Sequence, residues 1–418
     1  MRTEVFQQYE SEVRSYCRAF PTVFKRAKGS FIEGEDGRRY LDFFAGAGAL
    51  NYGHNPDFIR DKLIDYLRDD GIMHALDMYT VAKGEFIQSL QEKILLPRKL
   101  DYRVQFCGPT GTNAVEAALK IARKVKGRQN IFAFQGGFHG MSLGSLACTG
   151  NQYNRKGAGT TLPNVTFMPY PFGAMEKIDT IAYMDAVLSD PSSGIDKPAA
   201  VLLETVQAEG GVVVAPVEWL KKLRALCDRH DILMIVDDIQ VGCGRTGNFF
   251  SFERAGIVPD VITLSKSISG CGLPMAILLL KPEIDKWSPG EHNGTFRGNQ
   301  LAFIGGAAAL EMWTSLDIQG QVEKKSRFVE SALRSIIEEV DPRLSLRGLG
   351  LIWGVDFTVT GDNDLIERVL AKCFEKGLII ENAGRKGQVM KLLPPLTVSE
   401  SELQQGLDII RASMKECF

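Results

Sequence analysis

Apolar residues along the middle of the chain follow two periodicities that predict alternating strands and helices. Runs rich in β-branched and other apolar residues, typical of strands buried on both faces, lie at 104–107, 131–134, 200–205, 232–240 and 260–266. Stretches with helical spacing separate several of these runs, as at 114–123 and 219–230. This alternation predicts an α/β fold whose mostly parallel sheet is covered by helices on both faces.

The two ends of the chain show a mixed pattern. The first 30 residues predict a helix and a connecting segment, and residues 30–43 predict a β-hairpin, because Asp36-Gly37 is a strong turn signal between two strand-like runs. A long helical stretch then runs from about residue 300 towards Val340. The tail adds predicted strands at 351–357, 378–380 and 389–393 and a helix from about Ser399.

These patterns predict two domains. A chain of 418 residues with 44% hydrophobic content is long enough for one large domain and a smaller one. We expect the large domain at 76–320 and a small α+β domain built by both termini, from residues 1–75 and 321–418.

Charge and cysteine content exclude several classes of function. The chain has 49 basic and 51 acidic residues, so no basic excess suggests nucleic acid. No apolar stretch approaches the roughly 18 residues of a membrane helix, and the N-terminus lacks a signal-peptide core, so we expect a cytoplasmic protein with no membrane partner. The 8 cysteines are scattered without a C-x-x-C or Cys/His cluster, which favours free thiols and no metal site.

Two of the buried runs end in charged residues, Asp237 and Lys266. Functional groups collect at the carboxyl ends of strands in α/β sheets, so both side chains are expected in one crevice. Amine chemistry on pyridoxal phosphate needs this pair: a lysine that holds the coenzyme covalently and an acid that keeps its pyridine nitrogen protonated. Taken alone, either residue is far more often an ordinary strand-end residue that faces solvent.

A glycine- and threonine-rich turn at 108–113 opens the helical stretch at 114–123. Its backbone N–H groups, its hydroxyls and the positive end of the helix dipole suit a phosphate group. The turn is neither a Walker loop nor a G-x-G-x-x-G turn. Simple helix capping is the alternative interpretation.

Two further loops offer candidate contacts to a ligand. Phe138 lies between glycines at a strand end, where it could stack on a flat ring. Taken alone, a core position is the more common explanation for Phe138, as a structural role is for His139. The small-residue loop at 44–55 would let the backbone approach a ligand closely. Packing against another subunit would need small residues equally.

With these motifs in order, the sequence resembles the class III (ω-amino acid) aminotransferases of pyridoxal-phosphate-dependent fold type I. The resemblance covers nearly the whole chain. It is carried by the segments 12–21, 43–55, 108–113, 237–247, 294–299 and 393–396. It implies a fold with a large domain and a small one, pyridoxal 5'-phosphate as cofactor, and transfer of an amino group from a small-molecule donor to an oxo acid or aldehyde.

The resemblance implies a role for each residue around the coenzyme ring. Lys266 would hold the coenzyme covalently and, once displaced by substrate, move the proton between the substrate carbon and the C4′ carbon. Asp237 would pair with the pyridine nitrogen, Gln240 would hydrogen-bond the ring hydroxyl oxygen, and Phe138 would stack on the ring face.

The resemblance also implies how the phosphate is held. Gly111 and Thr112 would bind it through N–H and hydroxyl groups, and Thr295 would reach it from the partner subunit of a dimer. On this reading the protein is a homodimer or a higher homo-oligomer with shared active sites.

Three positions concern the substrate. Lys391 stands where the family usually has an arginine for the α-carboxylate of glutamate, and lysine lacks the bidentate fork of arginine. Arg297, where relatives commonly have a small residue, could restore such a fork. Glu209 matches the family glutamate that neutralises the carboxylate-binding cation when an amine substrate is bound, with a capping or surface glutamate as the alternative.

Asp238 replaces a glutamate of many relatives.

A catalytically silent protein of this fold, serving as a binding module, is the alternative outside the enzyme class. The presence of both Lys266 and Asp237 argues against it.

Overall fold

A seven-stranded sheet forms the centre of the computed structural model, which describes residues 3–362 and 364–418. The strand order is β4-β12-β11-β10-β7-β5-β6. The strands are β4 (Arg103–Phe106), β5 (Ile131–Phe134), β6 (Val165–Met168), β7 (Ala200–Leu203), β10 (Leu233–Asp237), β11 (Val261–Leu264) and β12 (Ile277–Leu280). All are parallel except β12, which pairs antiparallel with both neighbours. The predicted α/β class with a mostly parallel sheet is therefore confirmed.

Helices cover both faces of this sheet, because successive strand residues point to opposite sides. On β10, Leu233 and Ile235 pack in the apolar cluster that includes the buried side of α6 (Gly111–Lys126). Met234 and Val236 pack in the larger cluster, which includes the buried side of α10 (Val217–Arg229). Two-sided burial explains why these strands appear in the sequence as continuous apolar runs.

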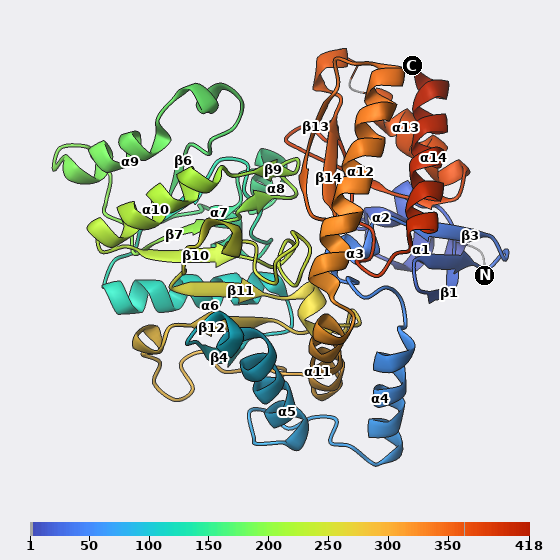
Figure 1. The fold of residues 1–418 in the computed structure, drawn as a ribbon. Helices are drawn as coiled ribbons and strands as arrows, with labels where there is room; N and C mark the ends of the chain where they lie inside the picture. The colour runs from blue at the N-terminus through green and yellow to red at the C-terminus, as the bar shows by residue number, and fades with distance from the viewer. Residues whose placement is uncertain (1–2, 363) are drawn as a thin grey trace.

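The two chain ends combine in a second region, at the right of Figure 1. One four-stranded sheet has the order β1-β2-β3-β15, in which β15 lies parallel to β3 and joins the C-terminal part to the N-terminal hairpin. A second has the order β13-β14-β17-β16. Their strands are β1 (Phe24–Lys28), β2 (Phe31–Gly34), β3 (Arg39–Asp42), β13 (Ser345–Leu349), β14 (Ile352–Asp356), β15 (Leu378–Ile379), β16 (Glu381–Ala383) and β17 (Val389–Leu392). The predicted hairpin is confirmed as β2 and β3, while the predicted domain bounds stay a prediction.

Two parts of the sequence prediction are corrected. The first 30 residues form α1 (Glu4–Tyr9), α2 (Tyr16–Ala19) and the strand β1, which pairs with β2 and was not predicted. The long helical stretch is two helices, α11 (Gln300–Ser315) and α12 (Ile318–Val340), bent by 70°. Asp317 at the break has φ 44° and caps α12 by accepting from the Gly320 N–H.

Other helices and strands complete the two regions. They are α3 (Ala45–Gly48), α4 (Asp57–Arg68), α5 (Val81–Leu90), α7 (Leu143–Cys148), α8 (Gln152–Lys156), α9 (Thr180–Ser189), α13 (Leu365–Glu375), α14 (Glu400–Cys417) and the short strands β8 (Val206–Gln207) and β9 (Val213–Val214). Across the described parts of the chain, no single helix has the length and apolar content to cross a membrane. The helices α11 and α12 have that length and apolar content only when taken together, as a bent pair.

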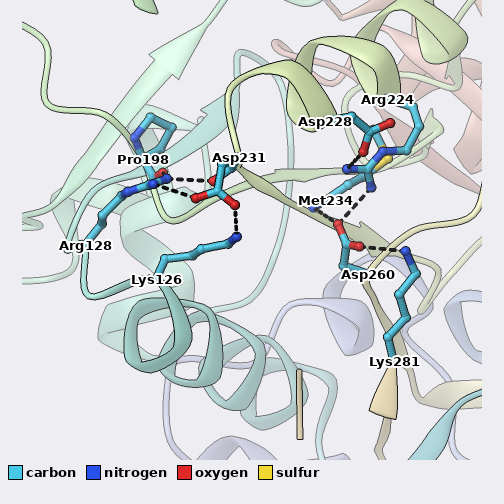
Figure 2. A network of polar contacts seen from close by, with 9 residues as sticks. All are labelled: Lys126, Arg128, Pro198, Arg224, Asp228, Asp231, Met234, Asp260 and Lys281. Atoms are coloured by element: carbon cyan, nitrogen blue, oxygen red, sulfur yellow. Dashed lines mark hydrogen bonds and ion pairs between the residues drawn. The ribbon is translucent and has the colours of Figure 1, made fainter. Parts of the chain in front are cut away.

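Charged side chains anchor the amino ends of β10 and β11 (Figure 2). Asp260, just before β11, accepts from the Met234 N–H of β10 at 2.8 Å and pairs with Arg224 and Lys281, each at 2.8 Å. Burial would raise the pKa of Asp260, but Arg224 and Lys281 outweigh it and keep the pKa low. The two strands are thus held in register at the end of the sheet opposite Asp237.

A buried arginine links the two regions of the chain. Arg245 follows β10 and donates to the carbonyls of Leu351 and Pro394 and, at 2.6 Å, to Asn51 Oδ1. Its side chain is fully buried, and burial lowers its pKa to about 9. Since an unpaired buried charge is strongly unfavourable, these acceptors fix how the N-terminal and C-terminal segments meet the large sheet.

Candidate active site

A cavity of about 190 Å³ lies at the carboxyl ends of the central strands. Asp237 at the end of β10 and Lys266 just after β11 both line it, as does Gln240. Asp237 is the register partner of Thr263 in the adjacent strand, which brings the carboxylate and the amine to one edge of the sheet. Gly111 and Thr112 from the start of α6, with Phe138 and Glu209, line the same cavity.

Lys266 is held by the small-residue loop of the N-terminal region. Its Nζ donates to the Ala47 carbonyl at 2.9 Å, and the neighbouring Ser267 hydroxyl donates to the Gly48 carbonyl at 2.6 Å. The loop makes these contacts from a left-handed turn, with φ between 47° and 82° from Ala45 to Gly48. Burial lowers the pKa of Lys266, which favours the neutral amine that covalent chemistry requires.

The Asp237 carboxylate is oriented from three sides. Oδ2 contacts His139 Nδ1 at 2.8 Å, while Oδ1 accepts from the Thr263 hydroxyl at 3.1 Å and the Ile239 N–H at 3.2 Å. Asp237 is 4% exposed, so it meets a ligand from within the cavity. His139, for which the sequence favoured a structural role, therefore belongs to the site. Its place beside Phe138 in a strand-end loop was the one sequence signal for this.

Glu204, at the end of the run at 200–205, is a second site residue that sequence reasoning missed. It lines the cavity, and its Oε1 accepts from the Phe138 N–H at 3.1 Å. Burial, together with the nearby Asp237 charge, raises its pKa well above the usual range. The neutral form of Glu204 is thus favoured beside Asp237, and its hydrogen bond fixes the backbone at Phe138.

Glu209 holds a cation at one wall of the cavity. Lys391 Nζ, on β17, lies 2.6 Å from Glu209 Oε1, which also accepts from Gln240 Nε2 at 3.1 Å. Burial would raise the pKa of Glu209, but Lys391 and Lys266 lower it to about 2. The Lys391 side chain is fully buried behind Glu209. Glu209 is neither a helix cap nor a free surface residue.

Thr295 and Arg297 lie outside this cavity in their own chain. Thr295 is exposed, and its carbonyl accepts from His74 Nε2 at 2.9 Å. Arg297 Nε donates to the His292 carbonyl at 2.9 Å, and the side chain lines a separate cavity that Trp287 also borders. A single chain therefore does not bring either residue to Lys266.

Asp238 differs from its neighbour Asp237. It is fully buried and accepts from the Ser251 N–H at 3.0 Å and from the Ser251 hydroxyl. Burial raises its pKa to about 7. Asp238 thus braces the loop after β10 and does not line the cavity.

The residues of the cavity fit pyridoxal phosphate. The anchored Asp237 carboxylate could pair with the pyridine nitrogen, and Lys266, whose pKa burial lowers, could bind the aldehyde. The first N–H groups of α6 and the Thr112 hydroxyl could bind the phosphate. Glycines keep this end open: a Cβ at Gly111 would lie 3.0 Å from Ile239, and one at Gly140 would lie 2.5 Å from the Thr112 hydroxyl.

Comparison with known proteins agrees with this geometry. The family model for class-III aminotransferases matches residues 14–414. A diaminobutyrate--2-oxoglutarate transaminase of Bordetella parapertussis is 54% identical over 420 residues, covering 100% of this chain and 96% of that protein. The transaminase of the same name from Streptomyces avermitilis is 54% identical over 416 residues, covering 99% of this chain and 97% of that protein.

Solved structures show the same fold. The ornithine aminotransferase of Toxoplasma gondii aligns with a TM-score of 0.86 at 25% identity, covering 98% of this chain and 93% of that chain. A second structure of that enzyme, at 26% identity with a TM-score of 0.86 and covering 99% of this chain and 94% of that chain, holds pyridoxal phosphate at partial occupancy in its active site. The chain belongs to the class III aminotransferases. It is an aminotransferase that uses pyridoxal phosphate.

Proposed function

We propose that this enzyme transfers the amino group of L-glutamate to the aldehyde of L-aspartate 4-semialdehyde, which gives L-2,4-diaminobutyrate and 2-oxoglutarate. The names of the relatives at 54% identity support this substrate pair. The observation that carries it in the structure is the Lys391–Glu209 pair at the cavity wall. Glutamate brings a carboxylate next to the reacting carbon, whereas the reacting end of diaminobutyrate has none, so the cation must be available to one substrate and masked for the other.

In this proposal each residue keeps the role that the family resemblance implies. The coenzyme supplies the electron sink that lets the amino group move. Lys266 Nζ binds it covalently and moves the proton at the substrate carbon, and Asp237 holds the proton on the pyridine nitrogen. Gln240 contacts the ring hydroxyl, and Phe138 covers the ring face. Gly111 and Thr112 hold the phosphate.

The substrate pair is tested by following the absorbance of the coenzyme-bound enzyme in the near-visible range. Diaminobutyrate and glutamate, added separately, are expected to remove the band, whereas ornithine and 4-aminobutyrate are expected to act far more slowly. If ornithine or 4-aminobutyrate acted faster, the enzyme would be an aminotransferase for that ω-amine. Absence of any band after adding pyridoxal phosphate would refute the proposed role of Lys266.

We also propose a cytoplasmic location, in keeping with cysteines that are all unpaired. The diaminobutyrate formed would serve ectoine synthesis. Supply of a siderophore or a peptide antibiotic is the alternative pathway, and the neighbouring genes would distinguish the two.

We propose further that the enzyme is a homodimer, or a higher homo-oligomer, with shared active sites. Large apolar side chains are exposed on the loop before α5, at the first residue of α5 and on the loop that carries Thr295 and Arg297. They are Ile72, Met73, Leu76, Met78, Tyr79, Val81 and Phe296. His74 joins the two loops, since its ring packs edge-on against Phe296 at 5.6 Å. Apolar patches of this kind mark protein interfaces, and docking there would let Thr295 and Arg297 reach a partner's cavity.

Placing a charge at the centre of this patch is expected to separate the subunits. Tyr79→Asp, at a side chain that is 101% exposed, should sediment as a monomer and bind pyridoxal phosphate about tenfold more weakly, because the partner's Thr295 is lost. Tyr153→Asp is the matched control, at an 87% exposed tyrosine far from this patch in sequence. A dimeric Tyr79→Asp protein would refute the proposed interface.

A further inference from the structure

Lys391 lies against a second carboxylate, which the family resemblance did not point to. Glu381 on β16 is the direct cross-strand partner of Lys391 on β17, and its Oε1 lies 3.0 Å from Lys391 Nζ. The Glu381 side chain is 10% exposed and that of Lys391 is 0% exposed. One buried ammonium is therefore shared by Glu381 and Glu209.

The two carboxylates differ in where they lie relative to the cavity. Glu209 lines the cavity and lies on the segment between β8 and β9, where its carbonyl accepts from the Gly384 N–H at 2.9 Å. Glu381 lies within β16 and does not line the cavity. A substrate carboxylate that enters the cavity can therefore take the place of Glu209 but not that of Glu381.

Glu381 therefore sets how much positive charge Lys391 offers to the cavity. With Glu381 ionised, the ammonium keeps one counter-charge after Glu209 has moved, so a substrate carboxylate is attracted less. With Glu381 neutral, the full charge of Lys391 is available. Interactions between buried charges are strong enough for this difference to alter affinity by an order of magnitude.

Burial and the neighbouring charges together bring the pKa of Glu381 close to neutral pH. Burial raises the pKa of Glu381 to about 7, against the opposing effect of Lys391. Glu209 raises the pKa further and Lys266 lowers it, while the Tyr16 hydroxyl of α2 also lies within range of its charge. Helix α13, which packs on β16, keeps its charged residues at the surface or half-buried: Glu367, Arg368, Lys372 and Glu375.

We propose that Glu381 is a specificity-determining residue that weakens the binding of substrate carboxylates at Lys391, so that one cavity serves both a dicarboxylate and a diamine. This proposal rests on the proposed function, which identifies the two substrates. Glu381 acts through Lys391 and touches no substrate. The lysine at position 391 fits this arrangement, since its flexible ammonium needs a fixed strand partner to hold it in place.

Glutarate, a dicarboxylate without an amino group, tests the proposal because it binds without reacting. Its affinity for the coenzyme-bound enzyme is measured by calorimetry at pH 6 and pH 8.5. Glu381→Gln should bind glutarate about tenfold more tightly than the unaltered enzyme at pH 8.5 and equally well at pH 6. The KM for diaminobutyrate should rise in this variant while that for glutamate falls.

Two controls separate charge from structure. Glu338→Gln removes the same charge from an exposed position on α12 and should leave glutarate affinity unchanged at both pH values. Glu381→Asp keeps the charge and should keep the pH dependence. Because the charges of Lys266 and Glu381 interact, the near-visible band of each variant is titrated alongside the glutarate measurements.

The raised pKa also predicts how the variant folds. An acid whose pKa is higher in the folded than in the unfolded protein lowers stability at any pH where the unfolded protein ionises it. For Glu381 this cost is absent below pH 4.5 and complete above about pH 7. Glu381→Gln should therefore melt no lower than the unaltered enzyme at pH 8.5. Equal glutarate affinity in the two proteins at pH 8.5 would overturn the proposal. Tighter glutarate binding without any reaction of diaminobutyrate would instead refute the proposed substrate and leave the role of Glu381 intact.

Discussion

Lys266→Ala is expected to remove the near-visible absorbance band of the bound coenzyme and to reduce the rate of transamination by about 10⁴-fold or more. Lys266 is the lysine of the cavity, and burial favours its neutral form. Its Nζ has the Ala47 carbonyl as its hydrogen-bond acceptor, which directs the amine without holding it in an ion pair. The variant loses both the covalent attachment and the group that moves the proton.

Absorbance spectra and single-turnover rates with glutamate measure this effect. Lys286→Ala is the matched control, because Lys286 is an exposed lysine outside the cavity. Added methylamine is expected to restore part of the proton transfer in Lys266→Ala, since the cavity itself remains. A Lys266→Ala enzyme that kept its band and its rate would show that another amine binds the coenzyme.

Asp237→Asn should reduce kcat by about 10²- to 10³-fold, because an amide cannot hold a proton on the pyridine nitrogen as a carboxylate does. The position of the side chain should persist, since asparagine can still accept from the Thr263 hydroxyl and the Ile239 N–H. The contact with His139 changes most, because the amide replaces a charged partner at 2.8 Å.

Asp238→Asn provides the comparison one residue further along the chain. Asp238 is buried, does not line the cavity and braces Ser251, so its variant should keep kcat nearly unchanged. Its pKa of about 7 makes the ionised form a cost to folding above neutral pH, and the amide should not add to that cost. Equal losses of kcat in the two variants would mean that the whole loop had been disturbed and that Asp237 has no separate role.

The positions of Lys266 and Asp237 depend on the rigidity of β10 and β11. The amino ends of these strands are fixed by Asp260, and the left-handed turn from Ala45 to Gly48 supports the lysine from the other side. The N-terminal region therefore contributes directly to the active site. The small-residue loop contacts the site lysine segment through the Ala47 and Gly48 carbonyls, while its approach to a ligand and its packing against another subunit both stay predictions.

The sequence by itself determined the class of fold and the two central residues of the site. Strands buried on both faces must be continuously apolar, so β5, β7, β10 and β11 were visible as runs. The carboxyl ends of neighbouring parallel strands meet at one edge, so Asp237 and Lys266 could be placed together without coordinates. The strands β1, β6 and β12 were not predicted. β1 is largely exposed and shows no apolar run, whereas β12 is a short buried apolar run that the sequence prediction passed over.

Only the tertiary structure decided which side chains face one another across long sequence separations. His139 meets Asp237, and Glu381 meets Lys391, through contacts that depend on strand register and loop geometry. A shift of one residue would turn each strand side chain to the opposite face, and no local pattern in the sequence sets that register. The position of Thr295 and Arg297 outside their own cavity has the same origin, since packing of the whole chain determines which cavity a loop can reach.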